Sequence, residues 1–380
     1  MILLYRHGVR TPLPGEVQLD EAHGKPWPSW REPSSVLTPH GAAGVDRMAR
    51  YDRQRLAAAG LFDSDACPTP SSVWLWANTD QRTIASAQAY AEGFAPGCRL
   101  PVGHLPQGTE DPLFHPVQAG AVTFDAPSAV RAIHAETGGP DAITAPAATD
   151  LAAMARVMGC TDGHASAICD RRNWHGALTV ARDGRGLKLD GPIATTSGTA
   201  EVILMAYAEG KPLEQVGWGR TDAATRVQLS RLHGLLFDIH ARPRYVAERT
   251  AAVLSRRLLE LLDGPDAPKL AMLVGSDNNI VALASVLGVH FTMPSYGKDD
   301  PPIGGALGIA IWRKPGDARR HVQVFYQAQT LDQLRTLQPL DPAHPPATLE
   351  LHPAACPSNA SLCLLDDLRP ALQKAAALAR

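Results

Sequence analysis

The stretch Met1-Ile2-Leu3-Leu4-Tyr5-Arg6-His7-Gly8-Val9-Arg10-Thr11-Pro12 decides the fold of this chain and points to its chemistry. Its first five residues are apolar and predict a buried strand, so the charged cluster falls where that strand ends. The carboxyl ends of strands are where ligands bind in open α/β sheets. Two arginines around a histidine suit a phosphate dianion, because guanidinium groups orient its oxygens while a neutral imidazole attacks phosphorus. The alternative is a chance basic turn.

Two further apolar runs have the same character. Residues 72–77 lead to an Asn-Thr-Asp-Gln-Arg cluster, and residues 270–275 lead to Ser-Asp-Asn-Asn. Near-continuous apolar strands are typical of a parallel sheet that is covered on both faces. If the three strands lie side by side, their ends bring His7, Arg82 and Asp277 to one edge of the sheet.

The remaining pattern predicts an α/β fold with a mainly parallel central sheet flanked by helices. Apolar residues at helical spacing predict helices over residues 38–60, 82–94, 198–209, 225–240, 245–262 and 278–287. Strand-like runs return at residues 306–312, 321–326 and 348–351. Between about 108 and 191 the strand signal fades, which predicts an inserted, smaller and mainly helical domain. We expect residues 1–107 and 228–380 to form the α/β domain, residues 108–227 the insert, and the active site to lie in the cleft between them.

Composition excludes several classes of protein. The chain has 380 residues, 45% hydrophobic and 19% charged, as expected for a globular protein. Its 36 basic and 38 acidic residues give a net charge of −2, so neither nucleic acid nor an anionic membrane is expected as a partner. No apolar run is long enough to span a bilayer. Cysteines and histidines lack the spacing of a metal site, so no metal or other cofactor is expected.

The six cysteines form three pairs that are local in sequence. These pairs are Cys67/Cys98, Cys160/Cys169 and Cys356/Cys363. An even count in local pairs favours three disulfides and an oxidising compartment over six reduced, buried thiols. We therefore expect a periplasmic or secreted protein whose leader is absent from this sequence.

The chain resembles the histidine acid phosphatase family, in the group of bacterial periplasmic phytases and glucose-1-phosphatases. Besides residues 6–12, the resemblance rests on Asp80-Gln81-Arg82-Thr83, Asp111-Pro112-Leu113-Phe114, Gly217-Trp218-Gly219-Arg220, Ser276-Asp277-Asn278-Asn279 and Pro302-Ile303-Gly304-Gly305. These segments follow one another in the family's order over nearly the whole length. The cysteines at 67/98 and 356/363 also fall where relatives have cysteines.

The resemblance implies a phosphohistidine mechanism. His7 would attack the phosphomonoester, and Arg6, Arg10 and Arg82 would bind the phosphate oxygens. Asp277 would protonate the leaving alkoxide and later deprotonate water. Acid-shifted activity without a metal is expected.

Each assignment has a simpler alternative. Arg82 could only pair with Asp80 at a helix start, and Asp277 could only be an N-cap. Thr11 could serve the turn or lend its hydroxyl to the site.

Ser276 departs from the family, whose members usually carry His-Asp at this point. A serine hydroxyl can still donate one hydrogen bond to phosphate, but it is shorter and uncharged. The enzyme could be natural with a weaker phosphate clamp, engineered to slow turnover, or changed into a phosphate-binding protein with little catalysis.

The substrate side of the site is less specific. Many phytases have polar or basic residues directly after the first motif, where this chain has Leu13, and this favours the glucose-1-phosphatase side. Glu201 matches a polar position of relatives, and Lys25 could add positive charge near the mouth. Candidate substrate-binding residues are Thr11, Leu13, Lys25, Asp80 and Glu201.

The sequence thus predicts an acid phosphomonoesterase acting on inositol phosphates such as phytate, or on sugar phosphates such as glucose 1-phosphate. The alternative is a weakened or inactive binding homologue that retains the phosphate site. A phosphoglycerate-mutase-like phosphotransferase is disfavoured by the cysteine pattern and the insert. The expected partner is a small phosphate monoester, and the chain is expected to be a monomer or a weak homodimer.

Overall fold

A computed structural model describes residues 1–17, 25–160, 167–264, 266–357 and 362–380. In this part of the chain a central sheet consists of β1 (Ile2–Arg6), β2 (Val73–Ala77), β3 (Val102–Gly103), β6 (Leu270–Gly275), β7 (Ala306–Arg313), β8 (Arg320–Ala328), β9 (Ala347–Leu351) and β10 (Cys363–Leu364). The strand order is β10-β8-β7-β1-β6-β2-β3, and β9 pairs with β8. Strands β1, β6, β2 and β3 are parallel, whereas β7 to β10 pair in antiparallel fashion. The predicted α/β fold class is confirmed.

The apolar run that opens the chain is buried on both faces of the sheet. Ile2 and Leu4 pack into one core, and Leu3 and Tyr5 pack into the other. Successive side chains of a strand point to opposite faces, so covering both faces requires an uninterrupted apolar strand. This is the physical reason why β1 has no polar residue before Arg6.

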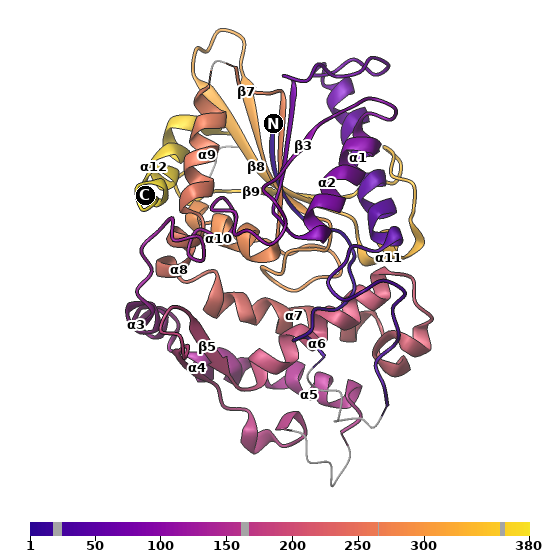
Figure 1. Ribbon diagram of the computed structural model, residues 1–380, viewed down its shortest axis with the longest axis vertical. Coiled ribbons are helices and arrows are strands. Elements are labelled where there is room, and N and C mark those ends of the chain that lie inside the picture. Colours follow the sequence, from indigo (N-terminus) through magenta and orange to yellow (C-terminus); the bar gives the residue numbers. More distant parts are fainter. Residues whose placement is uncertain (18–24, 161–166, 265, 358–361) are drawn as a thin grey trace.

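Helices cover both faces of the sheet (Figure 1). On the face of Leu3 lie α1 (Pro39–Ala58) and α2 (Gln81–Phe94). On the face of Ile2 lie α9 (Ala252–Asp263), α10 (Asp277–Leu287) and α12 (Leu365–Ala376). Helix α1 begins as predicted, because the Thr38 hydroxyl accepts a hydrogen bond from the Gly41 amide at 2.9 Å.

A second group of elements lies below the sheet in Figure 1. It contains α3 (Ala126–Thr137), α4 (Pro140–Thr144), α5 (Ala148–Val157), α6 (Pro192–Ala208), α7 (Ala223–His240) and a hairpin of β4 (Ala177–Val180) and β5 (Leu187–Asp190). Helix α8 (Arg244–Thr250) precedes α9, and α11 (Leu331–Thr336) precedes β9. Short 3₁₀ turns lie at Ala145–Ala147, Ala167–Cys169, Arg171–Asn173 and Leu213–Gly219. Helix α7 crosses the expected boundary between 227 and 228, and the division into two domains stays a prediction.

Two expected helices differ from the structure. The helix expected from 198 begins at Pro192, where Gly191 has φ 108° and the fixed φ of proline suits the first turn. Glu201 therefore lies in the middle of α6 and not near its start. The helix expected over 245–262 is interrupted at Ala251, which ends α8 and precedes α9.

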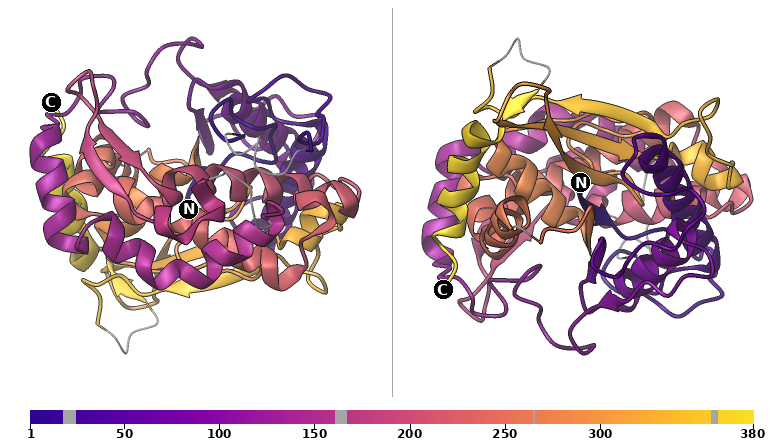
Figure 2. Two further views of the ribbon diagram at one scale, coloured as in Figure 1. Left: turned by 90° about the horizontal axis from the view of Figure 1, so that it is seen from below. Right: turned by 90° about the horizontal axis from the view of Figure 1, so that it is seen from above.

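Three disulfides join the predicted pairs. Their S–S bonds link Cys67 to Cys98, Cys160 to Cys169 and Cys356 to Cys363. Within the described residues, no helix combines the length and the apolar character that crossing a membrane requires. Viewed from below and above in Figure 2, the smaller group of helices lies across the end of the sheet.

Candidate active site

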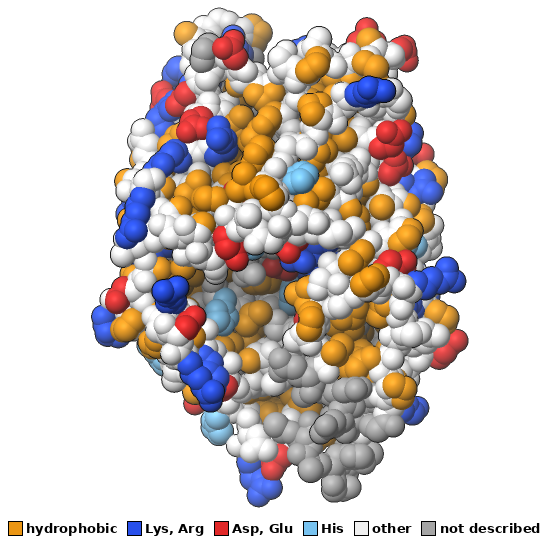
Figure 3. Space-filling view, in the orientation of Figure 1, with side chains coloured by type: hydrophobic (Ala, Val, Ile, Leu, Met, Phe, Trp, Pro, Cys, Tyr) orange, Lys and Arg blue, Asp and Glu red, His pale blue; other side chains and the backbone are white. Residues whose placement is uncertain are grey.

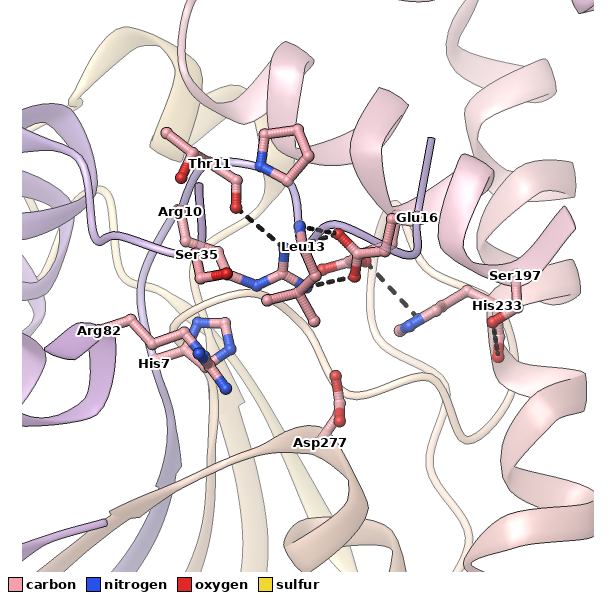
Figure 4. A network of polar contacts seen from close by, with 12 residues as sticks. His7, Arg10, Thr11, Leu13, Glu16, Ser35, Arg82, Ser197, His233 and Asp277 are labelled. Atoms are coloured by element: carbon pink, nitrogen blue, oxygen red, sulfur yellow. Dashed lines mark hydrogen bonds and ion pairs between the residues drawn. The ribbon is translucent and has the colours of Figure 1, made fainter. Parts of the chain in front are cut away.

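The site forms where three chain segments leave the parallel part of the sheet (Figure 4). His7 follows β1, Arg82 lies in the first turn of α2 after β2, and Asp277 is the first residue of α10 after β6. The register pairs Arg6 with Gly275, and Ala77 with Val274, so the three strands end at nearly the same level. This register is why residues distant in sequence meet at one edge, as predicted.

One ring nitrogen of His7 makes a hydrogen bond to the backbone. Its side chain is buried, and Nδ1 lies 2.9 Å from the carbonyl oxygen of Gly8. A carbonyl can only accept, so Nδ1 donates and Nε2 keeps its lone pair. Burial and the nearby charges of Arg82, Arg10 and Arg6 hold the pKa of His7 well below its usual value. The imidazole is therefore neutral, and hence nucleophilic, in mildly acidic solution.

Three arginines surround this imidazole. Arg6 and Arg10 are almost fully buried, and the Arg82 side chain is 15% exposed. The Nε atom of each is buried and has no hydrogen-bond partner. Other buried arginines of the chain share this feature, but the charges of these three act together on one histidine. A buried donor group without a partner is unfavourable, which favours an anion with several acceptor oxygens here.

Each of these arginines also contacts a carboxylate of the protein. The pairs are Arg6 with Glu201, Arg6 with Asp277 at 3.0 Å, Arg10 with Glu16 at 2.6 Å, and Arg82 with Asp80 at 2.8 Å. The simpler alternative for Arg82, an ion pair with Asp80, is thus present together with its place in the cluster. These contacts fix the guanidinium planes before any ligand binds.

Asp277 lies beside Arg6, and Ser276 precedes it as the N-cap of α10. The N-cap alternative for Asp277 is therefore wrong, although the Asn278 amide donates to its Oδ1 at 2.8 Å. Burial would raise the pKa of Asp277, but the charges of Arg6 and His233 outweigh burial and lower it. The Ser276 hydroxyl lies 3.0 Å from Oδ1 of Asn279, so it is engaged at the helix start.

Arg6 belongs to a buried network of ion pairs and hydrogen bonds. Glu201 on α6 is 1% exposed and contacts Arg6, and its Oε2 lies 3.7 Å from Nδ1 of His233 on α7. The same Nδ1 lies 2.7 Å from Oδ1 of Asp300, whose other oxygen accepts from the Ser230 hydroxyl. Burial lowers the pKa of His233, but Asp300 and Glu201 outweigh burial and raise it to about 9. His233 is therefore a buried cation below that pH.

The predicted substrate-binding residues make different contacts in the structure. The Thr11 hydroxyl donates to the Pro33 carbonyl at 2.6 Å, so it holds the loop after β1, and the Leu13 amide donates to Glu16 at 2.7 Å. Lys25 is exposed. Asp80 and Glu201 contact the arginines, as described above.

Sequence reasoning missed three residues of the site, namely Glu16, His233 and Asp300. Only Glu16 had a usable signal, because it is the first carboxylate after the arginine motif. Within the described residues, no group of three or more His, Cys, Asp or Glu side chains could hold a metal ion.

The surface is hollowed between the two groups of elements, and charged and histidine side chains lie in this hollow (Figure 3). A cavity beside Asp277 is lined by Ser276 and Asn278, and by Phe124, Leu236 and His240 from across the hollow. The site thus combines a neutral imidazole, a cationic rim and an adjoining cavity that could receive the organic part of a ligand.

Comparisons with known proteins agree with this geometry. The family model described as "Histidine phosphatase superfamily (branch 2)" matches residues 1–327. Phytase AppA of Escherichia coli strain K12 is 30% identical, over 94% of this chain and 86% of that protein. Glucose-1-phosphatase of Salmonella typhimurium is 29% identical, over 99% of this chain and 92% of that protein. The structure of Hafnia alvei phytase with tartrate superposes with a TM-score of 0.90 at 28% identity, over 98% of this chain and 96% of that one.

Proposed function

We propose that this chain, which belongs to branch 2 of the histidine phosphatase superfamily, hydrolyses sugar or inositol phosphate monoesters through a phosphohistidine on His7. It is a histidine acid phosphatase, and its relatives are named phytase and glucose-1-phosphatase. The observation that carries the proposal is the neutral, buried His7 imidazole with three arginines around it. Guanidinium groups stabilise the oxygens of a transferring phosphoryl group, while an uncharged ring nitrogen retains its lone pair for attack.

The first step forms a bond between phosphorus and Nε2 of His7 as the ester P–O bond breaks. The leaving alkoxide is a poor leaving group, so it needs a proton as it departs. In the second step water attacks phosphorus, the P–N bond breaks, and inorganic phosphate and neutral His7 are regenerated. We assign to Asp277 the role of giving the first proton and taking one from water. Its position beside Arg6 supports this, as does the cavity that its neighbours Ser276 and Asn278 line.

The proton on Asp277 arrives with the substrate. The pKa of Asp277 is lowered, mainly by Arg6, so the carboxylate is ionised in the free protein. A phosphate monoester has a second pKa near 6, so in mild acid it binds as a monoanion that carries a proton. Phosphate oxygens then share Arg6, which weakens its hold on Asp277 and favours proton transfer to the carboxylate. Because this proton is lost as the pH rises past about 6, activity on alkyl phosphates falls in that direction.

Ser276 favours a second candidate, a homologue that binds phosphate with little turnover. Its hydroxyl is engaged by Asn279 and adds no charge to the site. The presence of both His7 and Asp277 favours catalysis with a weaker clamp. The three disulfides support an oxidising compartment, and we propose a periplasmic or secreted enzyme.

The test is phosphate release in mildly acidic buffer from glucose 1-phosphate, phytate and nitrophenyl phosphate. We expect turnover that falls by at least about 10⁴-fold in H7A, because the nucleophile is removed. The ranking of the natural esters assigns the enzyme to the phytase or the sugar-phosphatase side. Tight phosphate binding without turnover of any ester would establish the second candidate.

A further inference from the structure

We propose that Glu16 determines specificity by selecting phosphomonoesters whose alcohol carries no second phosphate group. The inference rests on the proposed function, because it treats the arginine cluster as the phosphate site. Glu16 is an anionic side chain in contact with Arg10 of this proposed anion site. Figure 4 shows Glu16 against Arg10, on the side of the cluster away from Arg82.

The Glu16 carboxylate makes a paired contact with Arg10. Its two oxygens accept from the two terminal nitrogens of the guanidinium at 2.6 and 2.7 Å. Such a parallel pair of charge-assisted bonds is the strong arrangement between arginine and a carboxylate. The side chains are only 4% and 13% exposed, so water screens this pair little.

The carboxylate is also fixed from its own side. The Leu13 amide donates to Oε2 of Glu16 at 2.7 Å, and the Glu16 amide donates to the Leu13 carbonyl at 3.1 Å. Helix α6 packs directly against this turn, since a Cβ atom on Gly198 would lie 2.9 Å from the Cα atom of Glu16. Glu16 is therefore held in place by its own turn and by the opposite wall of the cleft.

Glu16 leaves part of Arg10 available for phosphate. It uses one hydrogen of each terminal nitrogen, and the Thr11 carbonyl takes a further one at 3.1 Å. The Nε hydrogen is buried without a partner, and one terminal hydrogen remains beside it. The phosphate that reacts can bind at Nε and the adjacent terminal hydrogen of Arg10 while Glu16 stays bound to the two terminal nitrogens.

A second phosphate on the substrate would meet a different environment. The loop after Arg10 reads Thr-Pro-Leu-Pro-Gly-Glu-Val and contains no lysine or arginine to receive it. On the other side of the cluster, Asp80 is 36% exposed and pairs with Arg82. A further phosphate group within several ångströms of Glu16 is therefore repelled, whereas the hydroxyl groups of a sugar are not.

The experiment compares two esters that differ by one phosphate, glucose 1-phosphate and glucose 1,6-bisphosphate. Initial kcat/KM values are measured for the natural chain and for E16Q, whose amide oxygen can still accept from Arg10 or Leu13. We expect the ratio of bisphosphate to monophosphate kcat/KM to rise about tenfold in E16Q. The matched control is E92Q, which removes the same charge from an exposed position on α2 and leaves the ratio unchanged.

A ratio that stays constant in E16Q overturns the proposal, even if both values fall, because equal loss means that Glu16 only positions Arg10. Failure of the proposed function looks different, because the natural chain then releases phosphate from neither ester. In that case the association constants of inorganic phosphate and of phytate are measured by calorimetry for the natural chain and for E16Q. An unchanged ratio of the two association constants in E16Q again overturns the proposal, and a ratio shifted toward phytate supports it.

Discussion

The two sides of the site are built in different ways. On the sheet side, His7, Arg10 and Arg82 lie within a few residues of a strand end. On the helix side, Glu201 and His233 come from α6 and α7, and their partners Arg6 and Asp300 lie 195 and 67 residues away in sequence. The first side presents charge to a ligand, whereas the second neutralises charge within the protein.

Burial is similar on the two sides, since His7 and Arg10 are only 2% and 3% exposed. Asp300 and Ser230 are fully buried, and Glu201 is 1% exposed, so this network has little access to solvent. A buried carboxylate persists only with partners, and here His233 and Arg6 supply the compensating charge. The comparison therefore predicts that changes on the sheet side alter chemistry, whereas changes on the helix side alter stability first.

The largest effect within this comparison is expected for D277N. Loss of a general acid slows an alkyl phosphate such as glucose 1-phosphate by about 10³-fold. Nitrophenyl phosphate should slow less than about tenfold, because its leaving group needs no proton. Steady-state kcat/KM for the two esters in the same mildly acidic buffer is the measurement. Equal slowing of both would remove Asp277 from the role of acid.

A smaller effect, on stability, is expected for His233. Its pKa is raised from 6.5 to about 9 in the folded chain, so folding is favoured wherever the folded histidine holds a proton that the unfolded one has lost. This stabilisation is complete below pH 6.5 and is lost as the pH rises through 9. The shift corresponds to about 3 kcal/mol. Urea unfolding at several pH values between 6 and 10 should show the free energy of unfolding falling over this window.

Two variants distinguish the contribution of His233 to the pH dependence of stability from that of other histidines. H233Q should be less stable at pH 6 and should lack the decline between pH 6.5 and 9. H344Q changes an exposed histidine and should keep the decline. A natural chain whose stability is flat across the window would show that His233 is not a buried cation.

The sequence predicts the sheet side of the site better than the helix side. The run Ile2–Tyr5 must be apolar because both of its faces are covered, so the strand and the position of His7 at its end were predictable. The pairing of His233 with Asp300 was not, because a histidine on an amphipathic helix carries no mark of a partner 67 residues away. The start of α6 was also missed, since the turn at Gly191 and Pro192 lies within a segment rich in glycine and alanine. Pairs of residues that are distant in sequence can be identified only once the fold is known, whereas the end of an apolar strand can be recognised from the sequence.

The most direct test of the central claim is to trap the covalent intermediate. The chain is mixed with excess nitrophenyl phosphate, quenched in alkali within milliseconds to seconds, digested and examined by mass spectrometry. The account predicts one added phosphoryl group on the peptide that contains His7, absent from H7A and more abundant in D277N with this ester, because hydrolysis of the intermediate then lacks its base. Turnover without phosphorylation of His7 in either protein, or phosphorylation at another residue that persists in H7A, would contradict it.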